Sequence, residues 1–535
     1  MRHLILAAFA LIAACSAPES NEQQAERRVA PILTGADARD DSSFARPEVA
    51  RVTHVALDLD ADFEAKRMAG TATLDIQAAE GAREIVLDSK GLEIEAVTDA
   101  DGQPLQYALG AGDERRGQPL TVRIGDSRRI AIRYRSAPNA EALQWLTPQQ
   151  TAGGRHAYLF SQGQAILNRT WIPTQDSPGI RQTWEARITA PEPLKVVMSG
   201  ERLTHEGEPA GDGRRAFRFR MNHPVAPYLI AIAAGDLAFR ELGPRTGVWT
   251  EPAMMDRAAG ELAHTERMVE APERLYGPYR WGRYDVIVLP PSFPYGGMEN
   301  PTLTFLTPTF IAGDKSLVGL VAHELAHSWS GNLVTNAVWA DSWLNEGFTS
   351  YFENRIMEAI YGRERAAQEA ALSWTAMEEA IAELGRDSPE TRLHNPGGDP
   401  NADTSGIVYD KGAIFLRTLE QIVGRERFDQ WLRSYFDRHA FQPMTSARFL
   451  ADLRANLVGG DAALERRLML DQWVYRPGLP ENAVRPNPNA FAAVDRAVRA
   501  YNAGGSAADL PYADWNTAER LRFLQAVPGG LGRGR

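Results

Sequence analysis

Two histidines, His323 and His327, stand four positions apart in the segment VAHELAHSWSGN, residues 321 to 332. The apolar residues around them follow a helical rather than an alternating rhythm, at Leu317, Leu320, Val321, Leu325 and Trp329. Because residues four apart lie on one face of a helix, both imidazoles can point at one ion. Glu324 lies one step around the helix and can reach a water on that ion. The pattern favours a metal-binding helix over a buried helix with two hydrogen-bonded core histidines.

A third ligand is offered by the segment WADSWLNEGFTSYFE, residues 339 to 353. Its apolar residues predict a buried helix face, at Trp343, Leu344, Phe348, Tyr351 and Phe352. Glu346 lies among them, where a buried carboxylate is costly unless it pairs with a cation. Zinc in a hydrolase usually takes three protein ligands and leaves one position for water. The set His323, His327 and Glu346 therefore suits one Zn2+ per chain, although residue type alone leaves cobalt or manganese open.

Two further acids flank Glu346, and each has two interpretations. We favour Asp341 as the N-cap of the predicted helix and Glu353 as a solvated charge. The alternative is that both carboxylates orient metal ligands through hydrogen bonds.

The segment PYGGMENP, residues 294 to 301, precedes the histidine helix. Its adjacent glycines, Gly296 and Gly297, allow the backbone to approach a ligand closely. Glu299 follows at once. The alternative is an ordinary glycine turn with a surface acid.

The motifs GGMEN, HELAH and NEG, in this order and at these distances along the chain, resemble the corresponding motifs of the M1 zinc aminopeptidases. Four segments resemble the bifunctional leukotriene hydrolase/aminopeptidase subgroup: SQGQAILNRTWIPTQDSP (161 to 178), TFLTPTFIAGDKSL (304 to 317), SGNLVTNAVWADSWLNEG (330 to 347) and VYDKGAIFL (408 to 416). The resemblance runs from about residue 47 to 480. It implies an α+β multidomain protein with a saddle-shaped antiparallel β-domain, a thermolysin-like catalytic domain and a helical C-terminal region.

The resemblance also implies roles for single residues. Glu324 would be the general base, and Tyr409 would donate a hydrogen bond to the oxyanion. Glu299 would bind the substrate's amino group with the help of Gln164. Gly296, Gly297 and Met298 would present backbone to the substrate as to an added strand. The implied function is a zinc metallo-aminopeptidase, with peptides carrying a free N-terminus as its substrates.

The strand and helix patterns predict the order of the domains. Alternating strands separated by Gly, Asp and Pro turns dominate residues 47–237, and helical patterns dominate residues 238–476. Residues 477–535 contain only two predicted helices, the second capped by Asn516. Helical stacks need several units to bury their faces. We therefore expect this last segment to be a linker followed by a reduced or truncated helical region.

The N-terminal sequence predicts where the protein is localised. Residues 1–14, MRHLILAAFALIAA, have the charged start and short apolar run of a signal peptide, and LIAAC resembles a bacterial lipobox with Cys15 as the lipidated residue. Residues 15–46 are polar and read as a tether. We expect a lipoprotein in the bacterial cell envelope, on the outer membrane facing the periplasm and bound to the membrane by its lipid. Cys15 is the only cysteine, which excludes an intrachain disulfide.

A net charge of −11 argues against a nucleic-acid partner. Three other functions are alternatives to an aminopeptidase. A thermolysin-like endopeptidase would share the zinc ligands but would need no amine anchor. Epoxide hydrolysis is disfavoured because the leukotriene subgroup has an aspartate where this chain has Asn401 and a tyrosine where it has Thr404. An inactive peptide-binding lipoprotein is disfavoured because Glu324 and Tyr409 are both present.

Overall fold

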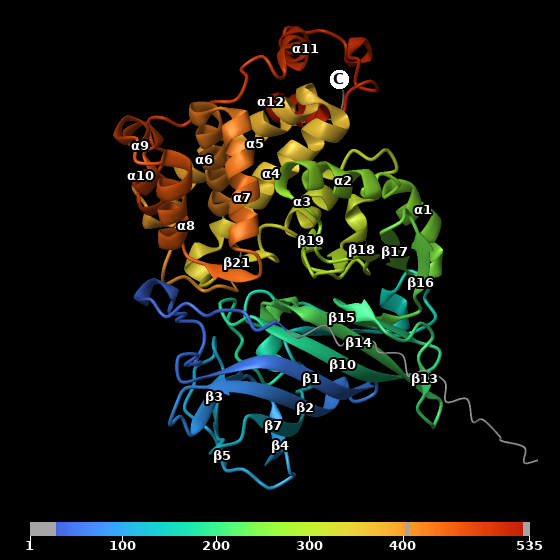
Figure 1. Ribbon diagram of the computed structural model, residues 1–535. Helices are drawn as coiled ribbons and strands as arrows, with labels where there is room; N and C mark the ends of the chain where they lie inside the picture. Colours follow the sequence, from blue (N-terminus) through green and yellow to red (C-terminus); the bar gives the residue numbers. More distant parts are fainter. Residues whose placement is uncertain (1–27, 402–405, 528–535) are drawn as a thin grey trace, which may run out of the picture.

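The computed structural model describes residues 28–401 and 406–527. Figure 1 shows a β-rich part, coloured blue to green, against a helical part, coloured green to red. The strands of the β-rich part are β1 (Ala50–Asp62), β2 (Arg67–Ala78), β3 (Glu84–Ser89), β4 (Glu93–Asp99), β5 (Tyr107–Leu109), β6 (Gln118–Arg123), β7 (Arg129–Arg135), β8 (Leu143–Leu146), β9 (Tyr158–Ser161), β10 (Gln182–Pro191), β11 (Lys195–Met198), β12 (Glu201–Arg202), β13 (Glu208–Pro209), β14 (Arg214–Val225) and β15 (Ile232–Gly235).

Three sheets make up this part. The largest has the order β12-β14-β10-β1-β2-β7-β4, with β13 also paired to β14. The others are β11-β15-β9-β8 and β3-β6-β5. The pairs are antiparallel except that β1 and β10 run parallel. The expected antiparallel domain therefore contains one parallel pair, because β10 joins β1 after a long excursion through β2 to β9 rather than through a hairpin.

The second part combines a small sheet with helices. Its sheet has the order β16-β17-β18-β20-β19 and places β19 at an edge. The strands are β16 (Ala238–Glu241), β17 (Thr246–Thr250), β18 (Tyr284–Val288), β19 (Gly297–Met298) and β20 (Leu303–Leu306), and a separate parallel pair is β21 (Val334–Asn336) with β22 (Gln442–Met444). The helices are α1 (Met255–Glu261), α2 (Thr265–Tyr276), α3 (Gly319–Ala326), α4 (Trp343–Tyr361), α5 (Arg363–Leu384), α6 (Ile407–Val423), α7 (Arg425–Arg438), α8 (Ser446–Leu453), α9 (Ala462–Leu468) and α10 (Leu470–Tyr475).

Helix α4 is the centre of the helical part. Its aromatic residues are buried as predicted, and it packs against α3, α5 and α6. A glycine on each helix lets α4 and α6 touch: a Cβ added to Gly347 would lie 2.7 Å from the Cα of Gly412. One continuous hydrophobic core runs through both parts of the protein. The chain passes from one sheet to another between β15 and β16, near the expected domain limit at residues 237 and 238. The domain limits stay a prediction.

The C-terminal segment contains α11 (Ala492–Asn502) and α12 (Thr517–Ala526). Asn516 caps α12 as predicted, in a reciprocal capping box with Glu519. These helices have a small core of their own, formed by Phe491, Val494, Val498, Trp515 and Phe523. Asn516 also donates a hydrogen bond of 2.9 Å to Gln368, which fixes α12 against α5.

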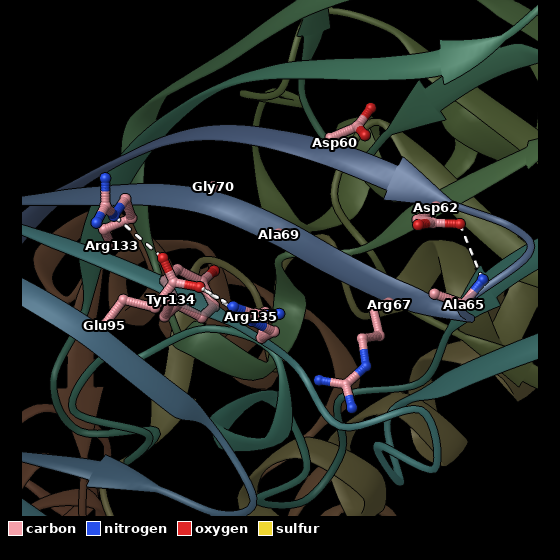
Figure 2. A pocket seen from close by; sticks show the side chains of 10 residues that line it. All are labelled: Asp60, Asp62, Ala65, Arg67, Ala69, Gly70, Glu95, Arg133, Tyr134 and Arg135. Carbon is pink, nitrogen blue, oxygen red and sulfur yellow. Dashed lines mark hydrogen bonds and ion pairs between the residues drawn. The ribbon is translucent and has the colours of Figure 1, made fainter.

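A cavity of about 570 Å³ lies on the largest sheet, and none of the predicted site residues lines it. Figure 2 shows its charged lining, in which Arg133 and Arg135 both reach Glu95. Asp60 is paired in turn with Arg214. Because these charges already neutralise one another, the cavity is a poor candidate for a ligand-binding site.

Candidate active site

Helices α3 and α4 bring the three predicted metal ligands together. His323 lies inside α3, and His327 is the residue at which that helix ends. Glu346 lies in the first turn of α4. The Nε2 atoms of both histidines are 3.4 Å from Oε2 of Glu346, and the donor atoms of all three residues lie within 4.8 Å of one another. Three donors that converge in this way, those of His327 and Glu346 buried and that of His323 partly buried, could hold one metal ion.

The partners of the histidines fix which ring nitrogen faces that point. Nδ1 of His323 is 3.1 Å from Oε2 of Glu353, and Nδ1 of His327 is 2.9 Å from the carbonyl oxygen of Ser330. Each Nδ1 therefore carries a hydrogen and donates it, which leaves the Nε2 lone pair free for a metal. Glu353 is thus an orienting residue, and the interpretation as a solvated charge is wrong because α4 turns its carboxylate toward α3.

Asp341 does not have the role that we favoured for it. The carboxylate does not cap α4; it accepts hydrogen bonds from the backbone and hydroxyl of Ser446, at the start of α8. It also lies 2.6 Å from Nδ1 of His394. The short spacing to α4 suggested a cap, but residues about fifty and one hundred positions away along the chain provide the partners.

The electrostatics of the three residues suit a bound cation. Burial raises the pKa of Glu346, but His327 and His323 outweigh it and hold that pKa at about 2. Burial lowers the pKa of His327, but Glu299 and Glu346 outweigh it and raise that pKa to about 9. The acidic groups thus stabilise a positive charge at the position where the donor atoms meet. The residues present fit a zinc ion.

A second group of potential donors is Glu299, Glu324 and His327. It is the poorer metal site, because Glu299 already accepts a hydrogen bond of 2.8 Å from the hydroxyl of Tyr228. Burial raises the pKa of Glu324 to about 7, against the opposing effect of His323 and His327. A carboxylate with that pKa is suited to exchange protons near neutral pH.

Glu299 lies directly after β19 and is only 3% exposed. Its backbone carbonyl accepts a hydrogen bond of 2.7 Å from Asn332. Burial raises the pKa of its carboxyl, although the charge of His327 opposes this. No sequence pattern points to Tyr228, which lies in the apolar segment APYLIA and comes from the β-rich part.

Strand β19 passes directly over Glu324. A Cβ added to Gly297 would lie 2.4 Å from Oε1 of Glu324, so that only glycine fits there. Within the part of the chain that the structure describes, Gly297 and Met298 pair with β20 on one side only, which leaves their other edge for an added strand. The sulfur of Met298 accepts a hydrogen bond of 3.4 Å from Gln162.

The structure supports the predicted roles of Tyr409 and Gln164 less directly. Tyr409 lies in the first turn of α6, and its ring centroid is 6.0 Å from that of His323. Gln164 is half-buried in the loop after β9, two residues beyond Gln162. Among the described residues, no side chain or backbone group forms a hydrogen bond with the Gln164 side-chain amide, and Glu299 is not one of its hydrogen-bond partners. Its predicted role stays a prediction.

Comparisons with known proteins agree with this geometry. Residues 261–473 match the model of the Peptidase family M1 domain, and residues 51–229 match that of the Peptidase M1 N-terminal domain. The chain is 39% identical over 453 residues to leukotriene A-4 hydrolase of Xenopus laevis, covering 82% of this chain and 74% of that protein. It is 37% identical over 458 residues to leucine aminopeptidase 2 of Yarrowia lipolytica, covering 83% and 69%.

Solved structures give the same result. The structure of yeast LTA4 hydrolase in complex with bestatin superposes with a TM-score of 0.84 at 32% identity, covering 92% of this chain and 80% of that one. An M1 zinc metallopeptidase from Deinococcus radiodurans superposes with a TM-score of 0.65 at 24% identity, covering 83% and 98%, and so shares the fold.

The comparisons correct the predicted localisation. The outer-membrane lipoprotein is wrong, because the relatives are leukotriene hydrolases and leucine aminopeptidases and both matching models describe peptidase domains. The lipobox rests on five residues, LIAAC, which are too few to fix a compartment. Within residues 28–401 and 406–527, no helix is long and apolar enough to cross a membrane. Residues 1–14 and Cys15 lie outside the described residues, and a membrane lipid is not supported as a partner.

The fold, the convergent histidine and glutamate donors and the matches over most of the chain lead to one assignment. The chain belongs to peptidase family M1 and is a zinc-dependent aminopeptidase.

Proposed function

We propose that His323, His327 and Glu346 hold one zinc ion and that Glu299 makes the site specific for peptides with a free amino terminus. The observation that carries the proposal is the buried carboxylate of Glu299 at the end of an open strand edge, beside Glu324. A substrate ammonium is strongly hydrated, so that only a paired anion can hold it in a site closed to water.

Each protein group then has a defined task. A bound zinc ion would polarise the scissile carbonyl and lower the pKa of a water molecule. Glu324 accepts the proton of the attacking water and passes it to the leaving amine. Tyr409 donates a hydrogen bond to the carbonyl oxygen as negative charge develops there. The backbone of Gly296, Gly297 and Met298 pairs with the substrate chain.

The amine anchor separates this function from that of an endopeptidase. In the proposed site, the ammonium lies against Glu299, and the first peptide bond lies over Glu324 beside Gly297. Only one substrate residue fits between Glu299 and the position of the cleaved peptide bond. Each cleavage therefore releases a single N-terminal residue. Gln164 is proposed to assist Glu299 from the loop after β9.

Epoxide hydrolysis is not favoured. The side-chain oxygen of Asn401 accepts hydrogen bonds of 3.2 Å from the backbone N–H groups of both Ala165 and Ile166. That oxygen is therefore engaged in holding a loop rather than in directing a water molecule. Thr404 lies outside the described residues.

The test compares one peptide with and without an N-terminal acetyl group. We expect the free peptide to lose single residues and the acetylated one to resist. In Glu299→Ala the buried ammonium loses its partner at a cost of about 2–5 kcal/mol, which is roughly 30-fold to several-thousand-fold in kcat/KM. Gln164→Ala should cost less, and both variants should retain their zinc. Similar cleavage of both peptides, or internal cuts in the blocked one, would assign an endopeptidase instead.

A further inference from the structure

The arrangement of β19 sets the direction in which a bound peptide runs, provided that the proposed function holds. Glu299 anchors the amine at one end of the strand, and Gly297 lies over Glu324, where the bond is cut. Gly296 is the next residue away from Glu299. A peptide that follows this edge therefore places the first residue of its leaving group beside Gly296.

A cavity of about 400 Å³ opens beside Gly296. Leu320 of α3, Leu372 of α5 and Leu521 of α12 form apolar walls. Glu353 and Glu369 line the same cavity together with one cation, Arg365. The combination of apolar walls and a charged lining resembles the surroundings of a long side chain with an apolar stem and an ionic end.

The charges of this cavity are not balanced. Arg365 contacts Glu369 through Nε at 3.1 Å, and its guanidinium also donates to the carbonyl oxygen of Ser316 at 2.9 Å. Oε2 of Glu369 is buried and has no hydrogen-bond partner. Glu353 adds a second carboxylate, which pairs with the imidazole of His323 at 3.1 Å but with no arginine or lysine among the described residues. Burial, and next the charge of Glu353, raise the pKa of Glu369 to about 7. A second cation in the cavity would stabilise both carboxylates.

We propose that this cavity receives the side chain immediately after the scissile bond and that Glu369 makes it select arginine or lysine. The leucines would pack against the methylene groups of such a side chain, and its charge would reach the carboxylates. Glu369 is a specificity-determining residue in this proposal and takes no part in bond cleavage.

The test uses amidated dipeptides that differ only after the scissile bond: Leu-Arg-NH2, Leu-Lys-NH2, Leu-norleucine-NH2 and Leu-Glu-NH2. Leucine p-nitroanilide, which has no residue at that position, reports the proposed aminopeptidase activity separately. We expect kcat/KM to be about 10-fold or more higher for the arginine and lysine peptides than for norleucine, as a charged hydrogen bond provides. The glutamate peptide should be the poorest.

Glu369→Gln should bring the arginine-to-norleucine ratio close to one. Glu364→Gln alters an exposed glutamate on the same helix and should keep the wild-type ratio. Because each ratio is measured within one enzyme, partial unfolding of a variant does not alter it. Equal wild-type rates for arginine and norleucine, or an unchanged ratio in Glu369→Gln, would overturn the proposal. Failure to cleave the p-nitroanilide as well would overturn the proposed function, and this inference with it.

Discussion

Glu324 and His327 lie one turn apart at the end of α3, yet their replacement should have different consequences. Glu324→Gln removes the base but no metal ligand, so that turnover should fall roughly 10²–10⁴-fold while the metal is retained. His327→Ala removes a ligand and should abolish both metal binding and activity. Metal content per chain, measured beside amide hydrolysis, distinguishes the two. Equal metal loss in both variants would contradict the assigned roles.

Two tyrosines should affect different kinetic constants. Tyr228 donates to Glu299. Loss of a hydrogen bond to a buried charged group costs about 1.5–3 kcal/mol, so that Tyr228→Phe should weaken kcat/KM roughly 10- to 150-fold through KM. Tyr409 is proposed to act only as the oxyanion forms, so that Tyr409→Phe should lower kcat roughly 10²–10³-fold with little change in KM. Steady-state kinetics on one aminoacyl amide would reveal either pattern, and an exchange of the two patterns would reject both roles.

The ligand residues could be predicted from the sequence because their geometry is largely local. Two residues on one helix turn, and a glutamate at the start of the next buried helix, converge wherever those helices pack. Tyr228 could not be predicted, since it lies 71 positions before Glu299 and meets it only through tertiary packing. Glu353 and Asp341 show the same limit, because their partners come from distant segments of the chain.

The contact between α4 and α6 positions two site residues at once. Glu346 directly precedes Gly347 on α4, and Tyr409 lies one turn before Gly412 on α6. A Cβ added to Gly412 would lie 2.6 Å from the Cα of Gly347. Overpacking of this kind costs about 1–3 kcal/mol, so that Gly412→Ala should lower Tm and kcat together.

Gly260→Ala is the matched control for this contact, because a Cβ at that position of α1 would meet nothing within 4 Å. It should leave kcat unchanged and keep or slightly raise Tm, since alanine is the better helix former. Thermal unfolding and amide hydrolysis would be measured on both variants. A Gly412→Ala variant with wild-type Tm and kcat would show that the close contact between the helices is not required.

Lys411, in the first turns of α6, ties that helix to two carbonyl groups. Its Nζ donates to Thr391 at 2.8 Å and to Arg476 at 3.0 Å. Burial, and next the charge of Arg392, lower its pKa to about 7, whereas the unfolded chain keeps the ordinary value of about 10.5. Between these two values the unfolded state binds more protons, so that this residue's contribution to stability rises with pH.

Lys411→Met removes this titration. The free energy of unfolding of the wild type relative to the variant should therefore increase from pH 7 to pH 10, by at most about 1.4 kcal/mol per pH unit. Denaturant unfolding at several pH values would measure it. A difference that is flat or falls over this range would show that the buried amine keeps an ordinary pKa.

At the scale of the whole molecule, the β-rich part completes the catalytic site. Tyr228 reaches Glu299, and Gln162 reaches Met298, each from a segment that precedes the catalytic domain. The order of the β-rich and helical parts could be predicted from alternating and helical patterns. The way in which they share a site could not, because no local pattern records which surface of one part meets the other.

Arg181 links the two parts directly. It is 3% exposed and lies just before β10. Its guanidinium donates to the carbonyl oxygens of Pro224 and Asn332, both at 2.6 Å, and to the hydroxyl of Thr335. Burial lowers its pKa to about 9. Asn332 in turn donates to the backbone carbonyl of Glu299, so that the arginine supports the amine anchor.

Arg181→Met should leave these buried acceptors without a donor, and each such group costs about 1–3 kcal/mol. We therefore expect a lower Tm and a raised KM for free-amine substrates, with kcat less affected because the bond-cleaving residues are not displaced. Arg187→Met is the control: Arg187 lies within β10, its side chain is 37% exposed, and it pairs at the surface with Asp58. Surface pairs of this kind contribute about 0–1 kcal/mol, so that this variant should behave as the wild type. Thermal unfolding and steady-state kinetics on both variants test the link, and equal Tm and KM values in the two would show that the parts are held together elsewhere.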